Sequence, residues 1–268
     1  MSTPAHASAL LAAYDNATRL PLRTAADASF GLTGAYRVAD QIRTARIARG
    51  ERQLGYKIGF TNRTIWPRYD VFGPIWGPVW HTTTQLLDSA HVEVALTGLV
   101  QPRLEPEIAF GFAKAPQAGM TELELSDCID WVAHAFEIVH THFDDWKFQA
   151  ADTVADFALH GRLYVGPRVP ISRFTAPASD LAALTVQLLR DGEPVDQGRG
   201  TNVLDGPLSA LRIWVDAMLA QPHGWPILPG YVVTTGTITD AAPMLPGQRW
   251  TTRLSESRLA DLTLVTQP

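Results

Sequence analysis

The chain has 268 residues, of which 46% are hydrophobic and 18% charged, so it has the composition of a globular protein with a sizeable core. A net charge of −5 without any basic stripe argues against a nucleic-acid-binding protein. The single cysteine, Cys128, excludes an intrachain disulfide, and because neither a charged leader nor an apolar run of roughly 20 residues is visible, we expect a cytoplasmic protein.

The first third of the chain is predicted to be mainly helical. Residues 5–19 carry an apolar stripe, and residues 33–49 form a longer helical pattern that Gly50 can end. The period then changes, because residues 54–60 (LGYKIGF) are typical of a strand that carries Lys57. Residues 61–84 are rich in proline and tryptophan, which indicates an irregular aromatic loop.

The remainder is predicted to be rich in strands. Two further helices are expected at residues 126–136 and 207–220. The segments with strand character are 92–100, 107–112, 137–143, 162–166, 184–195 and 231–238. Helices gathered first and strands afterwards favour an α+β fold over alternating β/α units.

Three glutamates interrupt apolar runs. Glu105 and Glu107 are two positions apart, so a strand would place both on one face, and Glu137 lies in a second apolar run, HAFEIVH. A solvated strand face is the common explanation of an isolated pair of this kind. The apolar flanks favour the alternative, an oxygen-rich site for Mg²⁺ or Mn²⁺, because converging carboxylates repel each other without a cation.

Five blocks of the sequence together resemble one family. Their order and spacing are similar to those of the 2-keto-4-pentenoate hydratase and 4-oxalocrotonate decarboxylase family of the fumarylacetoacetate hydrolase superfamily, from about residue 30 to the C-terminus. The blocks are LGYKIGFTN, EPEIAFGF, HAFEIVHTHFDDWKFQAADTVAD, DGEPVDQGRGTNVLDGPLSAL and LPGYVVTTGTIT.

The resemblance implies a fold and an assembly. We expect a mixed β-roll with an N-terminal helical portion. Residues 1–85 would form that portion with the lysine strand and the aromatic loop, and residues 86–268 the catalytic β-roll, in one compact unit. It also implies a homo-oligomer, with a complex with a pathway enzyme as a further option, and a small 2-keto acid as substrate.

The resemblance also implies site residues. Glu105, Glu107 and Glu137 match the ligands of one Mg²⁺ or Mn²⁺. Lys57 matches the family's strand lysine, which could orient the substrate carboxylate or act as a proton donor; we favour the first role. The catalytic base stays open between a carboxylate such as Glu107 and a water molecule. The turn that helps to hold the substrate's acid end falls on Thr235, Gly236 and Thr237.

The chain departs from the family pattern at two places. Where the family usually has V-D-x-P-D-Y-G, this chain has VFGPIWG, and where the family commonly has A-D-N-A-S, it has residues 155–159, ADFAL. Drift on a surface loop explains such changes simply. The alternative is a pocket for a larger, apolar substrate tail, walled by Trp76, Trp80, Phe157 and Leu159.

Two histidines also replace residues that the family usually has. His140 and His142 would share one face of a strand, as ligands of Zn²⁺ or Fe²⁺ do. Glu137 has the opposite strand parity from His140, so we favour a structural role for the pair.

Three functions remain open at this stage. The first is a metal-dependent hydratase of 2-hydroxydienoates in aromatic-compound catabolism. The second keeps the metal but decarboxylates an oxalocrotonate-like acid or hydrolyses a C–C bond of an acylpyruvate. The third is a non-catalytic partner subunit, against which the retained carboxylates and Lys57 argue.

Overall fold

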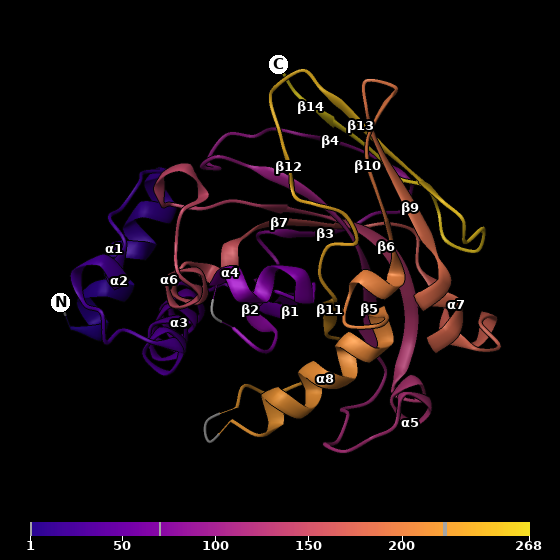
Figure 1. The fold of residues 1–268 in the computed structure, drawn as a ribbon, viewed down its shortest axis with the longest axis horizontal. Helices are drawn as coiled ribbons and strands as arrows, with labels where there is room; N and C mark the ends of the chain where they lie inside the picture. The colour runs from indigo at the N-terminus through magenta and orange to yellow at the C-terminus, as the bar shows by residue number, and fades with distance from the viewer. Residues whose placement is uncertain (1, 70, 222–223) are drawn as a thin grey trace.

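Two β-sheets face each other and helices cover their margins in the computed structural model, which describes residues 2–69, 71–221 and 224–268 (Figure 1). The α-helices of these residues are α1 (Thr3–Asn16), α2 (Arg23–Ala26), α3 (Leu32–Ala48), α4 (Trp66–Tyr69), α5 (Glu122–Ser126), α6 (Ala150–Ala155), α7 (Pro177–Ala183) and α8 (Pro207–Leu219). Their strands are β1 (Gln53–Gly59), β2 (Ile75–Trp80), β3 (Thr84–Leu86), β4 (His91–Val94), β5 (Arg103–Phe112), β6 (Ile129–Val139), β7 (His160–Val165), β8 (Val169–Pro170), β9 (Thr185–Arg190), β10 (Glu193–Arg199), β11 (Val232–Thr234), β12 (Ala242–Pro243), β13 (Arg249–Leu254) and β14 (Thr263–Thr266). The expected α+β class is confirmed.

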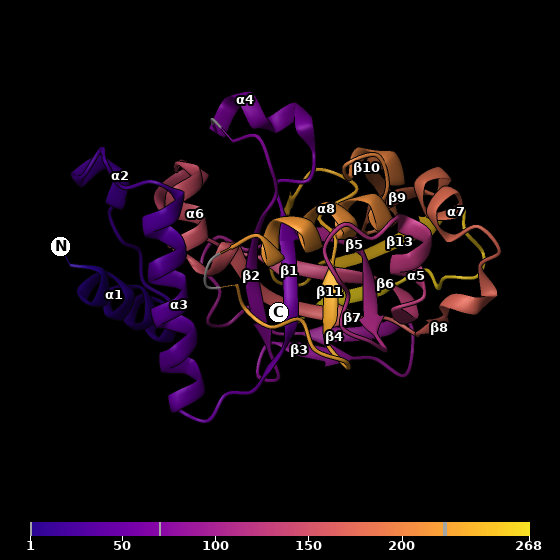
Figure 2. The same cartoon turned by 90° about the horizontal axis from the view of Figure 1, so that it is seen from below.

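The N-terminal helices pack together at one end of the molecule, beside α6 (Figures 1 and 2). Helix α3 buries Ala35, Val38 and Ile42, which are spaced by three and four residues and therefore share one face. The chain leaves this helix through Gly50, whose φ of 92° is a conformation that glycine adopts without steric cost. Both predicted N-terminal helices are confirmed, with ends shifted by at most three residues.

The larger sheet has nine strands, and its main path runs β2-β1-β11-β5-β6-β7-β3. Strand β11 lies parallel to β1 and antiparallel to β5, so it joins the lysine strand to the strands with the glutamates. In this register Lys57 is opposite Thr234, which in turn is opposite Ala109. The second sheet has five strands in the order β10-β9-β13-β14-β4.

The two faces of the larger sheet have different roles. On the outer face Leu104 and Phe136 pack against Leu188 and Trp250 of the second sheet, in one hydrophobic cluster. On the inner face of the curled sheet, small residues such as Ala109 lie side by side in another cluster. Because side chains alternate along a strand, the odd-numbered glutamates of β5 and β6 share the inner face with these alanines.

Two predictions of secondary structure are wrong. The helix expected at 126–136 is mostly strand β6, preceded by the short helix α5, which begins after the N-cap Thr121. Residues 132–139 are buried throughout, so the apolar run shows no strand alternation and resembles a helix in sequence. The predicted loop 61–84 contains the buried strand β2, whose apolar residues follow Pro74. Within the described residues, no helix combines the length and apolarity that a membrane crossing requires.

Candidate metal and substrate site

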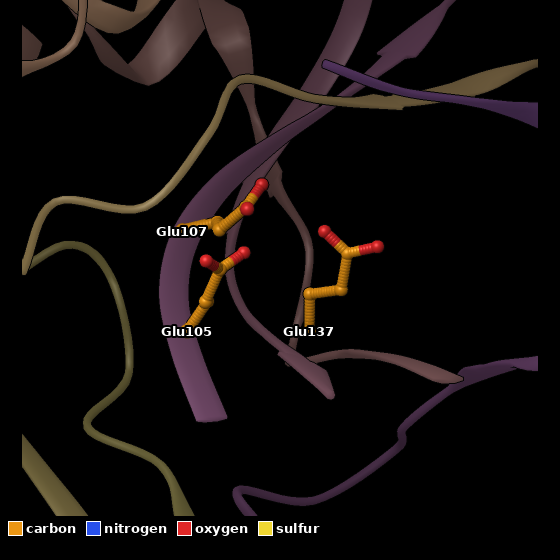
Figure 3. Close-up of side chains that lie close together, drawn as sticks. All are labelled: Glu105, Glu107 and Glu137. Atoms are coloured by element: carbon orange, nitrogen blue, oxygen red, sulfur yellow. The ribbon is translucent and has the colours of Figure 1, made fainter. Parts of the chain in front are cut away.

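The three glutamates lie together on neighbouring strands. Glu105 of β5 is directly opposite Glu137 of β6, and Glu107 is two residues further along β5. Each contributes a carboxylate oxygen to a group in which all three oxygens lie within 4.8 Å of one another (Figure 3). Glu107 and Glu137 are fully buried, whereas Glu105 retains part of its exposure at the rim of a cavity.

Burial sets the charge of these carboxylates. Desolvation, reinforced by repulsion from Glu137, raises the pKa of Glu107 well above 4.5. Desolvation also raises the pKa of Glu105 to about 7. Burial acts in the same direction on Glu137, but the charge of Lys57 and the hydrogen bond from His160 outweigh it, so the pKa of Glu137 falls.

Lys57 is the positive charge of this cluster. Its Nζ lies 2.9 Å from Oε2 of Glu137, and the side chain is only 3% exposed. Burial would lower its pKa, but attraction to Glu137, Glu105 and Glu107 raises the pKa instead, so Lys57 is protonated at neutral pH. One lysine faces three carboxylates, and the cluster is therefore short of positive charge.

The residues present fit a divalent cation. Oε1 of Glu107 is buried and has no hydrogen-bond partner among the described residues. An unpartnered buried carboxylate oxygen is costly, and a bound cation would satisfy it. All three donors are carboxylate oxygens, which suit the hard cations Mg²⁺ and Mn²⁺.

A cavity of about 310 Å³ opens beside the cluster. Lys57 and Glu105 line its polar end, close to Gly236 and Thr237. The remaining wall is largely apolar and aromatic, and it is lined by Phe60, Ile65, Tyr69, Ile75, Val139, Trp146, Phe148, Ala158 and Leu159. Helix α4, which carries Tyr69, stands away from the body of the molecule (Figure 2).

Stacked rings connect three segments around this cavity. The rings of Phe60 and Tyr69 stack at 4.9 Å between centroids, and those of Tyr69 and Phe148 stack at 5.7 Å. Arg103, at the same cavity, lies over the ring of Trp146 at 4.2 Å. Arg103 shares strand parity with Glu105 and Glu107, so the three follow one line along β5.

The turn after β11 meets the glutamates through its backbone. The N–H of Gly236 donates to Oε2 of Glu107 at 3.0 Å. Its φ is 96°, and a Cβ there would lie 2.0 Å from Oγ1 of Thr61, so only glycine fits. Thr237 lines the cavity. The hydroxyl of Thr235 donates to the carbonyl of Ile108 instead, which corrects the expectation that Thr235 faces the substrate.

The expected wall of tryptophans is wrong, whereas Leu159 lines the cavity. Trp76 lies opposite Ile58, one residue out of phase with Lys57, so it faces the other side of the sheet and packs on Tyr36. Trp80 has the same parity as Trp76 and lies against the guanidinium of Arg46.

Phe157 also points away from the cavity. Its ring packs on Tyr14, at 4.8 Å between centroids. Phe157, Ala158 and Leu159 have φ values of 57°, 52° and 65°, so three successive non-glycine residues adopt the left-handed conformation. This left-handed turn reverses the direction of neighbouring side chains, which the sequence pattern did not indicate.

Asp156 holds the left-handed turn in place. Its carboxylate accepts hydrogen bonds from the hydroxyl of Thr141 and from the backbone N–H and Nδ1 of His142. Both His140 and His142 are buried, and the backbone N–H of His140 donates to the carbonyl of Leu159. Nε2 of each ring is buried and has no hydrogen-bond partner among the described residues, so the structural role expected for the histidine pair stays a prediction.

Sequence analysis did not identify His160. Its Nδ1 lies 2.8 Å from Oε1 of Glu137, and the ring is buried. Burial lowers the pKa of His160 despite its carboxylate partner, so the ring is neutral. No motif indicated this contact, because it depends on the pairing of β6 with β7.

Comparisons with known proteins give relatives of this chain in sequence and in structure. No family model matches the chain. The chain is 35% identical over 218 residues to the 2-hydroxyhexa-2,4-dienoate hydratase of Comamonas testosteroni, which covers 81% of this chain and 80% of that protein. It is 32% identical over 202 residues to a 4-oxalocrotonate decarboxylase of Pseudomonas sp, covering 75% of each.

A solved structure is also similar over nearly the whole chain. The 4-oxalocrotonate decarboxylase from Pseudomonas putida G7, complexed with magnesium and adipate, has a TM-score of 0.88 and 27% sequence identity. The match covers 98% of this chain and 97% of that one. The expected mixed sheet with N-terminal helices is therefore confirmed as the fold of these proteins.

Proposed function

This chain belongs to the 2-keto-4-pentenoate hydratase and 4-oxalocrotonate decarboxylase family of the fumarylacetoacetate hydrolase superfamily, and on that premise we propose a specific reaction. The protein is a Mg²⁺- or Mn²⁺-dependent hydro-lyase that adds water to a 2-hydroxydienoate or 2-keto-4-enoate in aromatic-compound catabolism. One observation carries the proposal. A carboxylate cluster with Lys57 forms one end of a 310 Å³ cavity whose other walls are largely apolar.

The polar end of the cavity suits an α-keto acid. Glu105, Glu107 and Glu137 would hold the cation, which supplies Lewis-acid stabilisation of the enolate form of the substrate. Lys57 attracts the substrate carboxylate, and its ion pair with Glu137 fixes the position of the ammonium group. We assign the proton that moves along the dienol to a carboxylate of this cluster, Glu107, at the oxygen that does not hold the cation.

The apolar walls suit a substrate with a hydrocarbon tail. Phe60, Tyr69 and Phe148 form a continuous stack at the cavity, and Ile75 and Leu159 also line it. These residues replace Trp76, Trp80 and Phe157 as the proposed tail pocket. The hydratase of Comamonas testosteroni is named for a hexadienoate, which carries a methyl group beyond the pentadienoate.

Decarboxylation is the second candidate, and Arg103 favours it. Arg103 lines the same cavity on the glutamate face of β5. A guanidinium there suits the second carboxylate of an oxalocrotonate-like acid. The similarity to two 4-oxalocrotonate decarboxylases, one of them complexed with adipate, agrees with a dicarboxylate as the alternative substrate.

Substrate comparison distinguishes the two reactions. The purified protein with Mg²⁺ is incubated with 2-hydroxyhexa-2,4-dienoate, its pentadienoate homologue, 4-oxalocrotonate and an acylpyruvate, and products are identified by NMR. We expect hydration, with a higher kcat/KM for the hexadienoate than for the pentadienoate. If the main reaction is release of CO₂ from 4-oxalocrotonate, the protein is a decarboxylase and not a hydratase. Pyruvate formed from the acylpyruvate would indicate a C–C hydrolase.

Two wall variants sharpen this comparison. Phe148→Ala removes apolar area from the tail pocket and should lower kcat/KM for the hexadienoate more than for 4-oxalocrotonate. Arg103→Leu should do the reverse. Equal losses on both substrates would show that neither residue selects the substrate tail.

The non-catalytic alternative and the assembly have separate tests. A partner subunit without activity would bind metal in neither the parent protein nor a Glu107→Gln variant, so metal analysis of both distinguishes it from an enzyme. We also propose a homo-oligomer, which light scattering of the purified protein measures directly.

A further inference from the structure

We propose that His160 is a positioning residue for the Glu137 carboxylate, and that Thr83 in turn orients His160. This inference rests on the proposed metal site but goes beyond it, because neither residue touches the cavity. It concerns how the chain prepares one ligand before any cation arrives.

The geometry forms a continuous chain of hydrogen bonds. Nδ1 of His160 lies 2.8 Å from Oε1 of Glu137, and Nε2 lies 2.8 Å from Oγ1 of Thr83. The backbone N–H of Trp80 donates to that same hydroxyl oxygen at 3.3 Å. His160 and Glu137 are at most 1% exposed, so water does not compete for these bonds.

Chemistry fixes the direction of the bond to Glu137, and distances indicate the direction of the next one. An ionised carboxylate only accepts, so Nδ1 of His160 must carry the proton and donate to Glu137. In a neutral ring Nε2 then accepts, and the hydroxyl of Thr83 is its donor at 2.8 Å, a shorter contact than the 3.3 Å between the same hydroxyl and the carbonyl of Trp80. With the Thr83 proton in this shorter contact, the order Trp80 N–H, Thr83 O–H and His160 N–H points toward Glu137, and aligned bonds of this kind strengthen one another.

This chain of bonds makes Glu137 different from the other two glutamates. Its Oε1 accepts a hydrogen bond from His160, and its Oε2, which has no hydrogen-bond partner among the described residues, forms an ion pair with the ammonium group of Lys57. In Glu107 the N–H of Gly236 holds Oε2, whereas Oε1 has no partner among the described residues. Glu137 is thus locked in orientation and can serve as the fixed ligand, while Glu107 keeps an oxygen available.

The fold makes the contact possible in a specific way. His160 is the first residue after the left-handed turn, so the turn sets where its ring emerges beside β6. Thr83 precedes β3, which pairs in parallel with β7, and the N–H of Leu163 donates to the carbonyl of Thr83 at 2.8 Å. Backbone hydrogen bonds between the segments that carry them therefore hold both His160 and Thr83 in position.

Loss of the donor should weaken metal binding. Groups that orient a metal-binding side chain typically contribute about 10- to 100-fold in metal affinity. We therefore expect His160→Leu to weaken Mn²⁺ binding by that factor, measured by titration calorimetry and by the EPR signal of free Mn²⁺. In His160→Asn the amide nitrogen can take the place of Nδ1, so this variant should stay within about threefold of the parent affinity.

Three further variants control for structural damage. Thr83→Val should weaken Mn²⁺ binding by a few-fold, whereas Thr83→Ser, which keeps the hydroxyl, should not. His6→Leu makes the same change at a buried histidine on α1, away from the cluster, and should leave the affinity unchanged. If His160→Leu does not fold, the pair of Thr83 variants still decides the question.

The outcomes separate this inference from the proposed function. Mn²⁺ affinities that are equal in the parent, His160→Leu and Thr83→Val would overturn the positioning role, and so would equal weakening by leucine and asparagine at 160. If His160→Leu and Thr83→Val weaken Mn²⁺ binding as expected but the parent protein hydrates no dienoate, the positioning role is supported and the proposed reaction is refuted. Absence of Mn²⁺ binding in the parent protein would overturn both.

Discussion

Individual residues of the site differ in how far the sequence predicts them. Glu105 and Glu107 share a face by strand parity alone, which depends only on their spacing of two. Glu137 and Lys57 reach the cluster through strand pairing, which spacing does not encode, and the resemblance to a family supplied them. His160 had neither signal, because its contact depends on a turn with unusual backbone angles.

The metal-free protein should lose stability as the pH rises toward neutrality. The pKa of Glu105 is raised by burial from 4.5 to about 7, so the folded state binds more protons than the unfolded state in this interval. The contribution of Glu105 to the free energy of unfolding is therefore most favourable below pH 4.5. It falls by on the order of 3 kcal/mol as the pH rises through 7. Urea unfolding of chelator-treated protein between pH 4.5 and 8 measures the slope.

A Glu105→Gln variant is the control for this pH dependence. It has no proton to lose at this position, so its unfolding free energy should vary less with pH in the metal-free state. Glu137 has the opposite sign, because its lowered pKa contributes stability that is lost only as the pH falls below 4.5. If the unfolding free energies of the parent and the variant change with pH at the same slope, the pKa of Glu105 is not raised.

Asp156 should contribute strongly to stability through its buried carboxylate. Its buried carboxylate accepts three hydrogen bonds, so Asp156→Ala leaves the donors of His142 unpaired and should cost about 3–5 kcal/mol of unfolding free energy. Lys147→Ala is the control, since its ion pair with Asp145 is exposed and should be worth no more than about 1 kcal/mol. Denaturant unfolding of both variants gives the comparison.

At the scale of secondary structure, the errors of prediction have physical causes. The N-terminal helices were predicted because their apolar residues recur on one face. Strand β6 was mistaken for a helix because residues 132–139 are all buried and the strand has no polar face. The tail pocket was misplaced for two reasons. Trp76 is one residue out of phase with Lys57 and faces the other side of the sheet, and the left-handed turn directs Phe157 away from the cavity.

The left-handed turn depends on the absence of a side chain in the strand beneath it. A Cβ at Gly77 would lie 2.9 Å from Cβ of Ala158 and 3.0 Å from the carbonyl oxygen of Phe157. Gly77→Ala should therefore displace the turn, lower the unfolding free energy by about 1–3 kcal/mol and reduce activity. Thermal unfolding and kcat/KM are the measurements.

Two variants make this expectation specific. Gly73→Ala, a few residues earlier, meets nothing within 4 Å and should be neutral within about 0.5 kcal/mol. Adding Ala158→Gly to Gly77→Ala removes the closest contact and relieves one left-handed non-glycine residue, so the double variant should recover part of the loss. A double variant no better than Gly77→Ala would locate the strain elsewhere.

On the scale of the whole molecule, the cluster links metal binding to folding. The carboxylates come from two strands and Lys57 from a third, so the unfolded chain has no preformed site. At a Mn²⁺ concentration of about 100 times its dissociation constant, the folded state should gain about 2.7 kcal/mol. Differential scanning calorimetry should show this as a rise in Tm of about 5 °C or more. A Glu107→Gln variant should show a much smaller rise.

Fold class was predictable from sequence because it depends on the order of helical and strand-like segments along the chain. Strand order was not, because the sheet is joined across long distances in sequence. The three-residue strand β11 connects β1 to β5, although about 175 residues separate it from β1. Long-range pairing of this kind has no local pattern.

This position of β11 has a consequence for synthesis on the ribosome. Until Thr234 has left the exit tunnel, the half-sheet with Lys57 and the half-sheet with the glutamates have no strand between them, and both expose an unpaired edge. The nascent protein can therefore close this site only after β11 has been made, about 175 residues after β1, and until then the two edges are open to pairing with other chains.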